Sequence, residues 1–281
     1  MCGFFVNVWE GFMFQTAHII WIIISLVLIV VGVILCRYLR PSMNRMLKVC
    51  LCIGIVSEVI KFFSVSQIVP FINETFVKPD GTFGYNYSGA YTPILEVEHL
   101  PFEMCSLQLF FMAICLIASS EKVKHFLYVM MFATGIGGVI AIPLATLSVY
   151  YTDFADYMLS PRVWQFFLYH SMISVLSIYI GLSKETNIVF SDLKTAIIGA
   201  FAFDIPTFYL NGVLSEKVYV NDQLVGVTHR INFFSSYVNP VGLVLTEKWQ
   251  WILYIAIRDV ILVGLMTIMF VIFCKIIKKK Y

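Results

Sequence analysis

The chain has 281 residues, of which 60% are hydrophobic and only 13% are Asp, Glu, Lys or Arg. A soluble domain is about 45–50% apolar, so this composition excludes an ordinary water-soluble fold and predicts a membrane protein. The formal net charge is +2, and no run of like charges exceeds Lys278–Lys280, which argues against nucleic-acid binding through a basic face. Six of the seven Cys lie in or beside apolar runs, so we expect no structural disulfides.

Residues 1–17 are rich in aromatic side chains and carry one charge, Glu10. We expect this segment to lie in the membrane interface rather than to cross the bilayer. No basic residue precedes the first long apolar run, so the charged leader of a cleavable signal peptide is missing and the first span is expected to be retained. Residues 18–281 are expected to form a single transmembrane helical domain.

Seven apolar runs have about the 20 residues needed to cross the hydrocarbon core. They lie at 18–39, 46–70, 100–119, 123–150, 163–182, 193–214 and 250–274. On one side, the connections counted with the adjoining span ends (37–48, 121–125 and 183–194) and the tail carry 12 Lys and Arg, and on the other side the connections carry five. Because basic loops stay cytoplasmic, this asymmetry predicts an all-α bundle of seven spans with the N-terminus outside and the C-terminus inside.

The tryptophans agree with this orientation, because all five fall at the predicted outer interface, where amphipathic rings anchor spans. They are Trp9, Trp21, Trp164, Trp249 and Trp251. Two long connections, 71–99 and 215–249, also lie outside and are expected to cap an outer-facing cavity. Alternating residues around Asn221 and Asp222 predict a small β-hairpin over 218–225.

Ionisable residues inside predicted spans are costly, so each is a functional candidate. Glu58 and Lys61 are three residues apart on the second span and close enough to pair on a helix. Arg258 and Asp259 lie at similar depth in the last span and are expected to complete a network with them. These four residues either form a structural cluster that fixes helix packing or line a pathway.

Two later spans carry polar stripes on one helix face. Asp204, Thr207 and Asn211 form the first stripe, on the span at 193–214. The second stripe, on the span at 163–182, consists of His170, Ser174 and Ser177. Interhelical hydrogen bonding explains either stripe without chemistry, but His170 also titrates.

Cys105 is the candidate nucleophile because it matches His170 in depth. Pro101 suits the first position of the third span, which places Cys105 about one turn inside and roughly 7–8 Å below the outer end. His170 is expected roughly 10 Å below the outer end of its own span. A thiol and an imidazole at one depth form the nucleophile and base of acyl transfer through a thioester, and the alternative is a packing Cys with a hydrogen-bonded His.

Other residues are assigned by the same spacing arguments. Gln108, on the same face as Cys105, and Asn211 are candidate donors to an oxyanion. Cys50 and Cys52 have no His nearby, so we expect core packing and no metal site. Glycines in the span at 123–150 have the spacing of close helix packing, with a kink expected at Pro143.

Two sequence blocks resemble a known family. Leu100-Pro101 followed by Cys105-Ser106-Leu107 is similar to the L-P-x-x-x-C segment of the YwaF family of bacterial integral membrane proteins. The block Trp164-Gln165-Phe166-Phe167-Leu168-Tyr169-His170 is similar to that family's W-Q-F-F-x-x-H signature. Asn211, and Asn232 followed by an aromatic residue and Pro240, resemble less specific features. The resemblance covers most of the chain from residue 46.

The YwaF family is related to an animal transmembrane acyltransferase that remodels ethanolamine phospholipids with a Cys and a His. It is more distantly related to androgen-regulated fatty-acid-ester hydrolases, which use a Thr and a His. The resemblance implies that Cys105 is the nucleophile, that His170 is the general base and that the protein lies in a bacterial plasma membrane. One departure is Glu103, because family members often have His two residues before the Cys. On a regular helix Glu103 points about 200° away from Cys105.

These observations predict a membrane acyltransferase of the outer leaflet, without metal or nucleotide cofactor, that moves an acyl chain from a phospholipid to a lysolipid or an amine. One alternative keeps the site and changes the acceptor, giving a lipid-ester hydrolase or an acyltransferase for lipoprotein amino termini. Another is a transporter whose pathway is lined by intramembrane charges, among them Asp204 and Arg258. A third is a structural protein that interacts through its outer loops.

Overall fold

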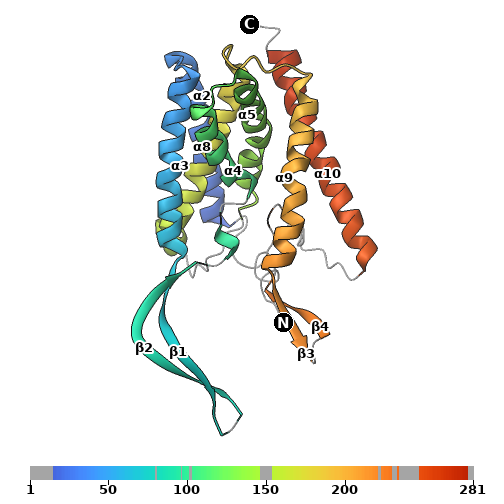
Figure 1. Ribbon diagram of the computed structural model, residues 1–281. Helices are drawn as coiled ribbons and strands as arrows, with labels where there is room; N and C mark the ends of the chain where they lie inside the picture. The colour runs from blue at the N-terminus through green and yellow to red at the C-terminus, as the bar shows by residue number, and fades with distance from the viewer. Residues whose placement is uncertain are drawn as a thin grey trace.

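The computed structural model describes residues 15–79, 81–95, 97–100, 103–145, 154–220, 223–229, 233 and 247–277. Within these ranges the protein is a bundle of roughly aligned helices with two β-hairpins at one end (Figure 1). The helices are α2 (Thr16–Leu39), α3 (Met43–Val65), η1 (Val97–His99), α4 (Met104–Ile117), α5 (Glu121–Thr134), α6 (Ile136–Ala141), α7 (Phe154–Leu159), α8 (Pro161–Leu182), α9 (Asp192–Leu214), α10 (Lys248–Phe270) and η3 (Val271–Ile277). The expected interfacial segment lies almost entirely outside the described residues.

Within the described ranges, five helical segments are long and apolar enough to cross a membrane, by length and composition. They are Thr16–Leu39, Glu121–Ala141, Pro161–Leu182, Asp192–Leu214 and Trp249–Lys275. The other two predicted spans correspond to α3, which carries several charged residues, and to α4, which is apolar but has only 14 residues. The structure therefore supports a multi-pass helical membrane protein with five candidate spans.

The second span was predicted too long. Helix α3 ends at Val65, and the N–H group of its C-cap Ser66 bonds to the Phe62 carbonyl. The residues that follow form strand β1 (Gln67–Val77) instead of more helix. Pro70 lies in this strand opposite Tyr91. Because proline lacks an N–H group, Pro70 disfavours a helix that continues through this position.

The third span was also predicted to begin too early. Helix α4 begins at Met104, and Glu103 is its N-cap residue in extended conformation. Cys105 is therefore the second residue of the helix and lies in its first turn, not about one turn inside. Pro101, which was expected to occupy the first helical position, lies outside the described residues.

The fourth span is broken at Gly135 rather than kinked at Pro143. Helix α5 ends at Thr134, and the short helix α6 follows after Gly135. A Cβ atom on Gly135 would overlap the Ser177 side chain of α8, so a larger residue at this break would push the two helices apart. Helix α6 ends at Ala141, before Pro143 is reached.

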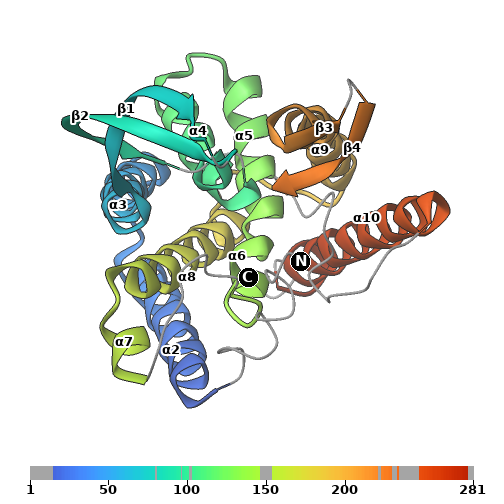
Figure 2. The same cartoon turned by 90° about the horizontal axis from the view of Figure 1, so that it is seen from below.

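Helix α8 is the centre of the bundle, because it packs against α2, α3, α5 and α6 (Figure 2). In the apolar stretch of α8, 67% of the residues are buried inside the protein, whereas in that of α2 only 17% are. Small residues allow this close packing. A Cβ atom on Gly138 of α6 would lie 2.8 Å from the Ser174 hydroxyl and 3.0 Å from the His170 carbonyl. The middle of α8 is therefore held tightly from several sides.

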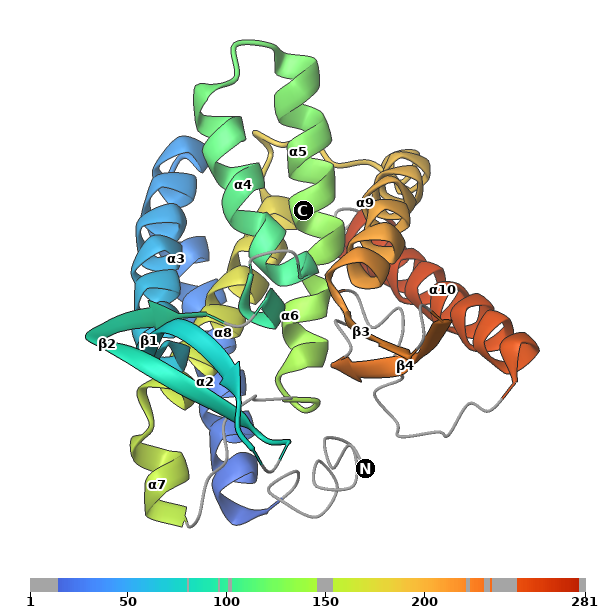
Figure 3. The ribbon, with the colours of Figure 1, turned by 60° about the horizontal axis from the view of Figure 1, so that its bottom comes forward.

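Helices α9 and α10 stand on the opposite side of the molecule from α3 (Figures 1 and 3). Helix α9 packs against α5, and α10 packs against α9 and α6. Most of the surface of α10 faces away from the protein, since only 17% of the residues in its apolar stretch are buried. Such a surface suits contact with lipid.

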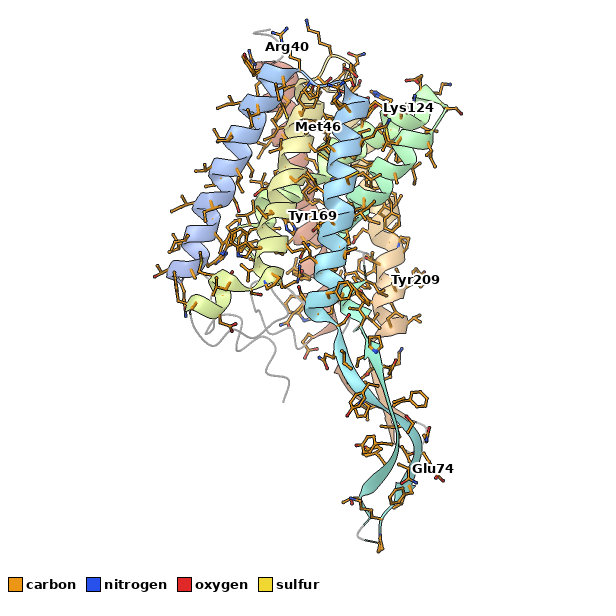
Figure 4. All side chains as sticks on the ribbon, turned by 90° about the vertical axis from the view of Figure 1, so that its left-hand side faces the viewer. Arg40, Met46, Glu74, Lys124, Tyr169 and Tyr209 are labelled. Atoms are coloured by element: carbon orange, nitrogen blue, oxygen red, sulfur yellow. The ribbon has the colours of Figure 1, made fainter. Side chains whose placement is uncertain are left out.

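Two antiparallel β-hairpins follow helices α3 and α9. Strands β3 (Glu216–Val220) and β4 (Gln223–His229) confirm the hairpin predicted over 218–225, and they extend beyond those bounds. Strands β1 and β2 (Phe83–Ile94) form a longer hairpin that was not predicted. This first hairpin projects away from the bundle, with Glu74 near its far end (Figure 4), so it does not cap the helices as expected.

Candidate functional site

The start of α4 lies deep within the bundle. Figure 1 shows that α4 stops short of the lower ends of α3 and α9. The hydroxyl of Tyr169 on α8 donates a hydrogen bond to the backbone carbonyl of Cys105 at 2.8 Å. Tyr169 comes eight residues after Pro161, which begins α8, or about 12 Å along the helix, and Figure 4 shows it about halfway along the bundle. Cys105 is therefore level with the middle of α8, although it lies in the first turn of its own helix α4.

The neighbours of Cys105 on α4 show which way the thiol faces. Leu109 lies about 40° from Cys105 around the helix and packs on Gly54 of α3, where a Cβ atom would overlap it. Gln108 lies about 60° away on the other side and hydrogen-bonds to α5. Cys105 consequently points toward the interior, between α3 and α5, and its side chain keeps partial exposure.

His170 follows Tyr169 directly and is buried in the same region, with 5% of its surface exposed. Its Nδ1 atom lies 2.7 Å from the carbonyl oxygen of Phe166. A carbonyl only accepts, so Nδ1 carries the ring proton and Nε2 is the basic nitrogen of the neutral imidazole. The Phe166 ring lies against the imidazole, with centroids 4.1 Å apart, and fixes the ring plane.

Charged residues act electrostatically on the Cys105 sulfur from α3 and from the N-cap of α4. Lys61 of α3 acts electrostatically on both Cys105 and His170. Glu103 also acts electrostatically on the sulfur. As the N-cap it lies outside the regular helix, so the 200° argument from helical spacing does not apply to it.

The contact between α3 and the first turns of α8 is polar. Gln165 donates a hydrogen bond to the Ser57 hydroxyl at 2.7 Å and accepts one from Arg162. Arg162 also lies over the Phe166 ring, 6.0 Å from its centroid. These contacts join α3 to the first turns of α8, which precede His170 on the same helix.

The expected charge network is wrong, because the charges form two separate groups. Lys61 and Glu58 pair within α3 at 2.7 Å, as their spacing predicted. Arg258 of α10 instead bonds to Asp204 of α9 and to its neighbour Asp259. The two groups belong to helices on different sides of the bundle (Figure 3).

The stripe on α9 faces inward, as expected, but its members bind protein groups. Thr207 donates to the Asp204 carbonyl at 2.6 Å. Asn211 is fully buried and forms two hydrogen bonds with the backbone of Phe233, at 2.9 and 3.0 Å. Asn211 therefore anchors the segment after β4 to α9, and one of its amide N–H groups is engaged by the Phe233 carbonyl.

Gln108 lies beside Cys105, but its amide nitrogen points away from an oxyanion position. Nε2 donates to the Thr134 hydroxyl at 2.6 Å and to the Met131 carbonyl at 3.2 Å, both on α5. The Thr134 hydroxyl itself donates to the Met130 carbonyl, which fixes it as an acceptor for Gln108. Both amide N–H groups of Gln108 are thus used between α4 and α5.

The other candidates are packing residues in this structure. Ser174 donates to the His170 carbonyl and Ser177 to the Phe132 carbonyl, each at 2.7 Å. Cys50 is buried in the core as expected, but Cys52 is exposed on the surface of α3, so the prediction of core packing is wrong for Cys52. Among the described residues, no three His, Cys, Asp or Glu side chains are grouped where they could hold a metal ion.

Tyr169 is the residue that the spacing arguments missed. It was one of the unspecified positions in the W-Q-F-F-x-x-H block, yet it connects α8 to the backbone of the candidate nucleophile. Gln165, a named position of that block, was given no role and connects α8 to Ser57 of α3. A buried Tyr usually needs a partner for its hydroxyl, and this was the available signal.

Comparison with known proteins gives one match. The TMEM164 family matches residues 13–276, which is nearly the whole chain. No curated protein and no solved structure matches the chain. The match includes both sequence blocks, the five candidate membrane spans and the recessed start of α4. The chain therefore belongs to the TMEM164 family.

Proposed function

We propose that this protein is a membrane acyltransferase that moves a fatty acyl chain from a phospholipid to a lysolipid or an amine through a thioester on Cys105. The observation that carries the proposal is the hydrogen bond from Tyr169 to the Cys105 carbonyl, because it brings the start of α4 to the residue next to His170. A nucleophile beside a buried base is the arrangement that covalent acyl transfer needs. Membership of the TMEM164 family is consistent with this activity.

In the first step, Nε2 of His170 takes the proton of the Cys105 thiol and the sulfur attacks an ester carbonyl of the phospholipid. The carbon–oxygen bond of the ester breaks, and the departing lysophospholipid oxygen takes the proton back from His170. In the second step, the acceptor attacks the thioester while His170 removes its proton, which then passes to the leaving sulfur.

Backbone groups at the start of α4 suit the oxyanion of each tetrahedral intermediate better than the amides first considered. The first bond within the helix runs from the Leu107 N–H to the Glu103 carbonyl, at 3.0 Å. The N–H groups of residues 104–106 therefore have no carbonyl acceptor within the helix. Their direction and the helix dipole favour negative charge at this end.

The proposal includes the orientation in the membrane. We propose that α3 and α4 complete a seven-span bundle with the N-terminus outside, which places the Cys105 region in the outer half of the bilayer. We also propose a place among the bacterial YwaF-like members and in the plasma membrane, supported by the two sequence blocks. Acceptors then include lysophospholipids of the outer leaflet and lipoprotein amino termini.

Trapping of the acyl-enzyme tests the function. Purified protein in detergent is incubated with a phospholipid carrying a labelled acyl chain, and protein-bound label is measured before and after hydroxylamine, which cleaves thioesters. We expect label on the wild type and none after Cys105→Ser. Cys115→Ser is the matched control, because Cys115 is buried on the same helix and should leave the label unchanged. Equal label on the wild type and Cys105→Ser would show that the covalent mechanism is wrong.

The alternatives give different results in companion assays. A hydrolase releases free fatty acid and leaves lysolipid without a second acylated product, and a lipoprotein acyltransferase changes the lipoproteins of a deletion strain, as mass spectrometry would show. A transporter gives substrate-dependent flux in proteoliposomes that survives Cys105→Ala. A purely structural role leaves every assay unchanged by substitution of Cys105 or His170.

A further inference from the structure

Gln108 has one polar atom that the packing of α4 does not explain. The side chain is buried, with 1% of its surface exposed, and its Nε2 atom is fixed on α5 by Thr134 and Met131. Its Oε1 atom is buried and has no hydrogen-bond partner in the part of the chain that the structure describes. A buried acceptor without a donor costs free energy, so such an atom calls for a function.

The position of Gln108 suggests what that function is. It lies three residues after Cys105, and side chains three apart on a helix are neighbours, about 5–6 Å between Cβ atoms. Long side chains on a helix also lean toward its N-terminus, so Gln108 leans toward the turn that holds Cys105. Its amide cannot be flipped to use Nε2 there, because the Met131 carbonyl only accepts hydrogen bonds and would then face Oε1.

We propose that Gln108 is a positioning residue for the second step of the proposed acyl transfer, and that its Oε1 atom accepts a hydrogen bond from the acyl acceptor. This inference rests on the proposed function and reverses the role expected from spacing, because Gln108 acts as an acceptor rather than an oxyanion donor. The first step needs no such acceptor, because a phospholipid ester carbonyl and the thioester carbonyl only accept hydrogen bonds.

The proposal also selects among acceptors. The attacking oxygen of a lysolipid has a single proton, and His170 removes it as the carbon–oxygen bond forms and the carbon–sulfur bond breaks. A hydrogen bond to Gln108 must therefore come from a second donor on the acceptor. Primary amines have one on the attacking nitrogen, and lysophosphatidylglycerol has hydroxyls in its headgroup. Lysophosphatidylcholine has no donor beyond the attacking hydroxyl.

Acceptor competition tests this inference in the full-length protein. The acyl-enzyme is formed first, and transfer is then followed to lysophosphatidylglycerol, to a primary amine and to lysophosphatidylcholine in the wild type and in Gln108→Met. We expect Gln108→Met to form the acyl-enzyme at the wild-type rate. Transfer to both multi-donor acceptors should fall about tenfold or more, through KM as well as kcat, while transfer to lysophosphatidylcholine changes less than about twofold. A loss confined to the amine or to lysophosphatidylglycerol identifies which source supplies the donor.

Two further variants separate positioning from packing. Thr134→Val removes the hydroxyl that binds Nε2 but leaves Oε1 in place, so it should retain the preference for multi-donor acceptors. Gln108→Glu in its protonated form donates through its O–H group to the Met131 carbonyl and retains the other oxygen as an acceptor. It should also keep this preference, and it serves if Gln108→Met does not fold. An equal loss for all acceptors, or an equal effect of Thr134→Val, would overturn the proposal and leave Gln108 as a link between α4 and α5. Absence of hydroxylamine-sensitive label in the wild type would instead contradict the proposed function itself.

Discussion

The hydroxyl of Tyr169 donates a hydrogen bond to the backbone carbonyl of Cys105, 2.8 Å away, and so joins the middle of α8 to the first turn of α4. This contact fixes the candidate nucleophile relative to the residue after Tyr169, which is His170. It is a contact between a side chain and the backbone, so it positions Cys105 without occupying its thiol. The consequences of this arrangement are testable.

Tyr169→Phe removes the hydroxyl and keeps the ring. We expect the free energy of unfolding to fall by about 1 kcal/mol, the usual contribution of one hydrogen bond, and acylation of Cys105 to slow about tenfold because its helix is less well placed. Tyr179→Phe is the matched control, since its hydroxyl donates to the Pro41 carbonyl elsewhere along α8. Thermal unfolding in detergent and the rate of acyl labelling check both variants. A slower reaction in Tyr179→Phe as well would mean that general destabilisation explains the effect.

His170→Gln keeps a polar side chain but removes the basic ring nitrogen. We expect the rate of thioester formation to fall by about 10²–10⁴-fold, the usual contribution of a general base. Ser171→Ala, next to it on α8, removes a hydroxyl that donates to the Phe167 carbonyl and should leave the rate unchanged. Single-turnover labelling measures both. Wild-type labelling by His170→Gln would exclude the assigned base.

Gly138→Ala adds a methyl group where α6 meets α8. The new Cβ atom would lie 2.8 Å from the Ile173 side chain and 3.0 Å from the His170 carbonyl, which is backbone and cannot rotate away. We expect a loss of about 1–3 kcal/mol in the free energy of unfolding. Gly137→Ala is the control, because nothing lies within 4 Å of its added Cβ atom and Ala favours the helix. Thermal unfolding should separate the two, and equal midpoints would contradict the packing described for α6.

Arg258→Met leaves the buried carboxylate of Asp204 without its cation. Breaking a buried pair in this way costs about 3–5 kcal/mol, so we expect a marked fall in the unfolding temperature. The double variant Arg258→Met with Asp204→Asn should recover part of it, because the uncompensated charge is gone. Folded protein of either variant should still form the acyl-enzyme, since the ion pair lies on α9 and α10. Loss of labelling in folded protein would place these charges in the reaction.

The helices could be predicted from the sequence because each span must be apolar over a length set by the bilayer. The seven apolar runs all contain helix, and α8 and α9 match their predicted spans to within about two residues at each end. The β1–β2 hairpin was missed because the run at 46–70 stayed apolar past the end of α3. A signal was present, since Phe83, Tyr85 and Tyr87 alternate as in a strand.

The candidate site was predictable in its residue types but not in its contacts. Matched depth brought Cys105 and His170 together in the prediction; the structure joins the Cys105 backbone to Tyr169, and the pairing of the thiol with the imidazole stays a prediction. The estimated depth of Cys105 within its own helix was wrong, because the prediction assumed that every span starts at the membrane surface. Which way an amide points also depends on neighbouring helices, so the partners of Gln108 and Asn211 could not be read from helical spacing.

The 14 residues of α4 span only about 21 Å, less than the roughly 30 Å of hydrocarbon in a bilayer. In the proposed reaction, the ester of a phospholipid therefore has to sink below the glycerol level to meet the sulfur at this recessed end, level with Tyr169, while its tails stay within the bilayer. The energy otherwise required to extract its tails would then be spared at every turnover.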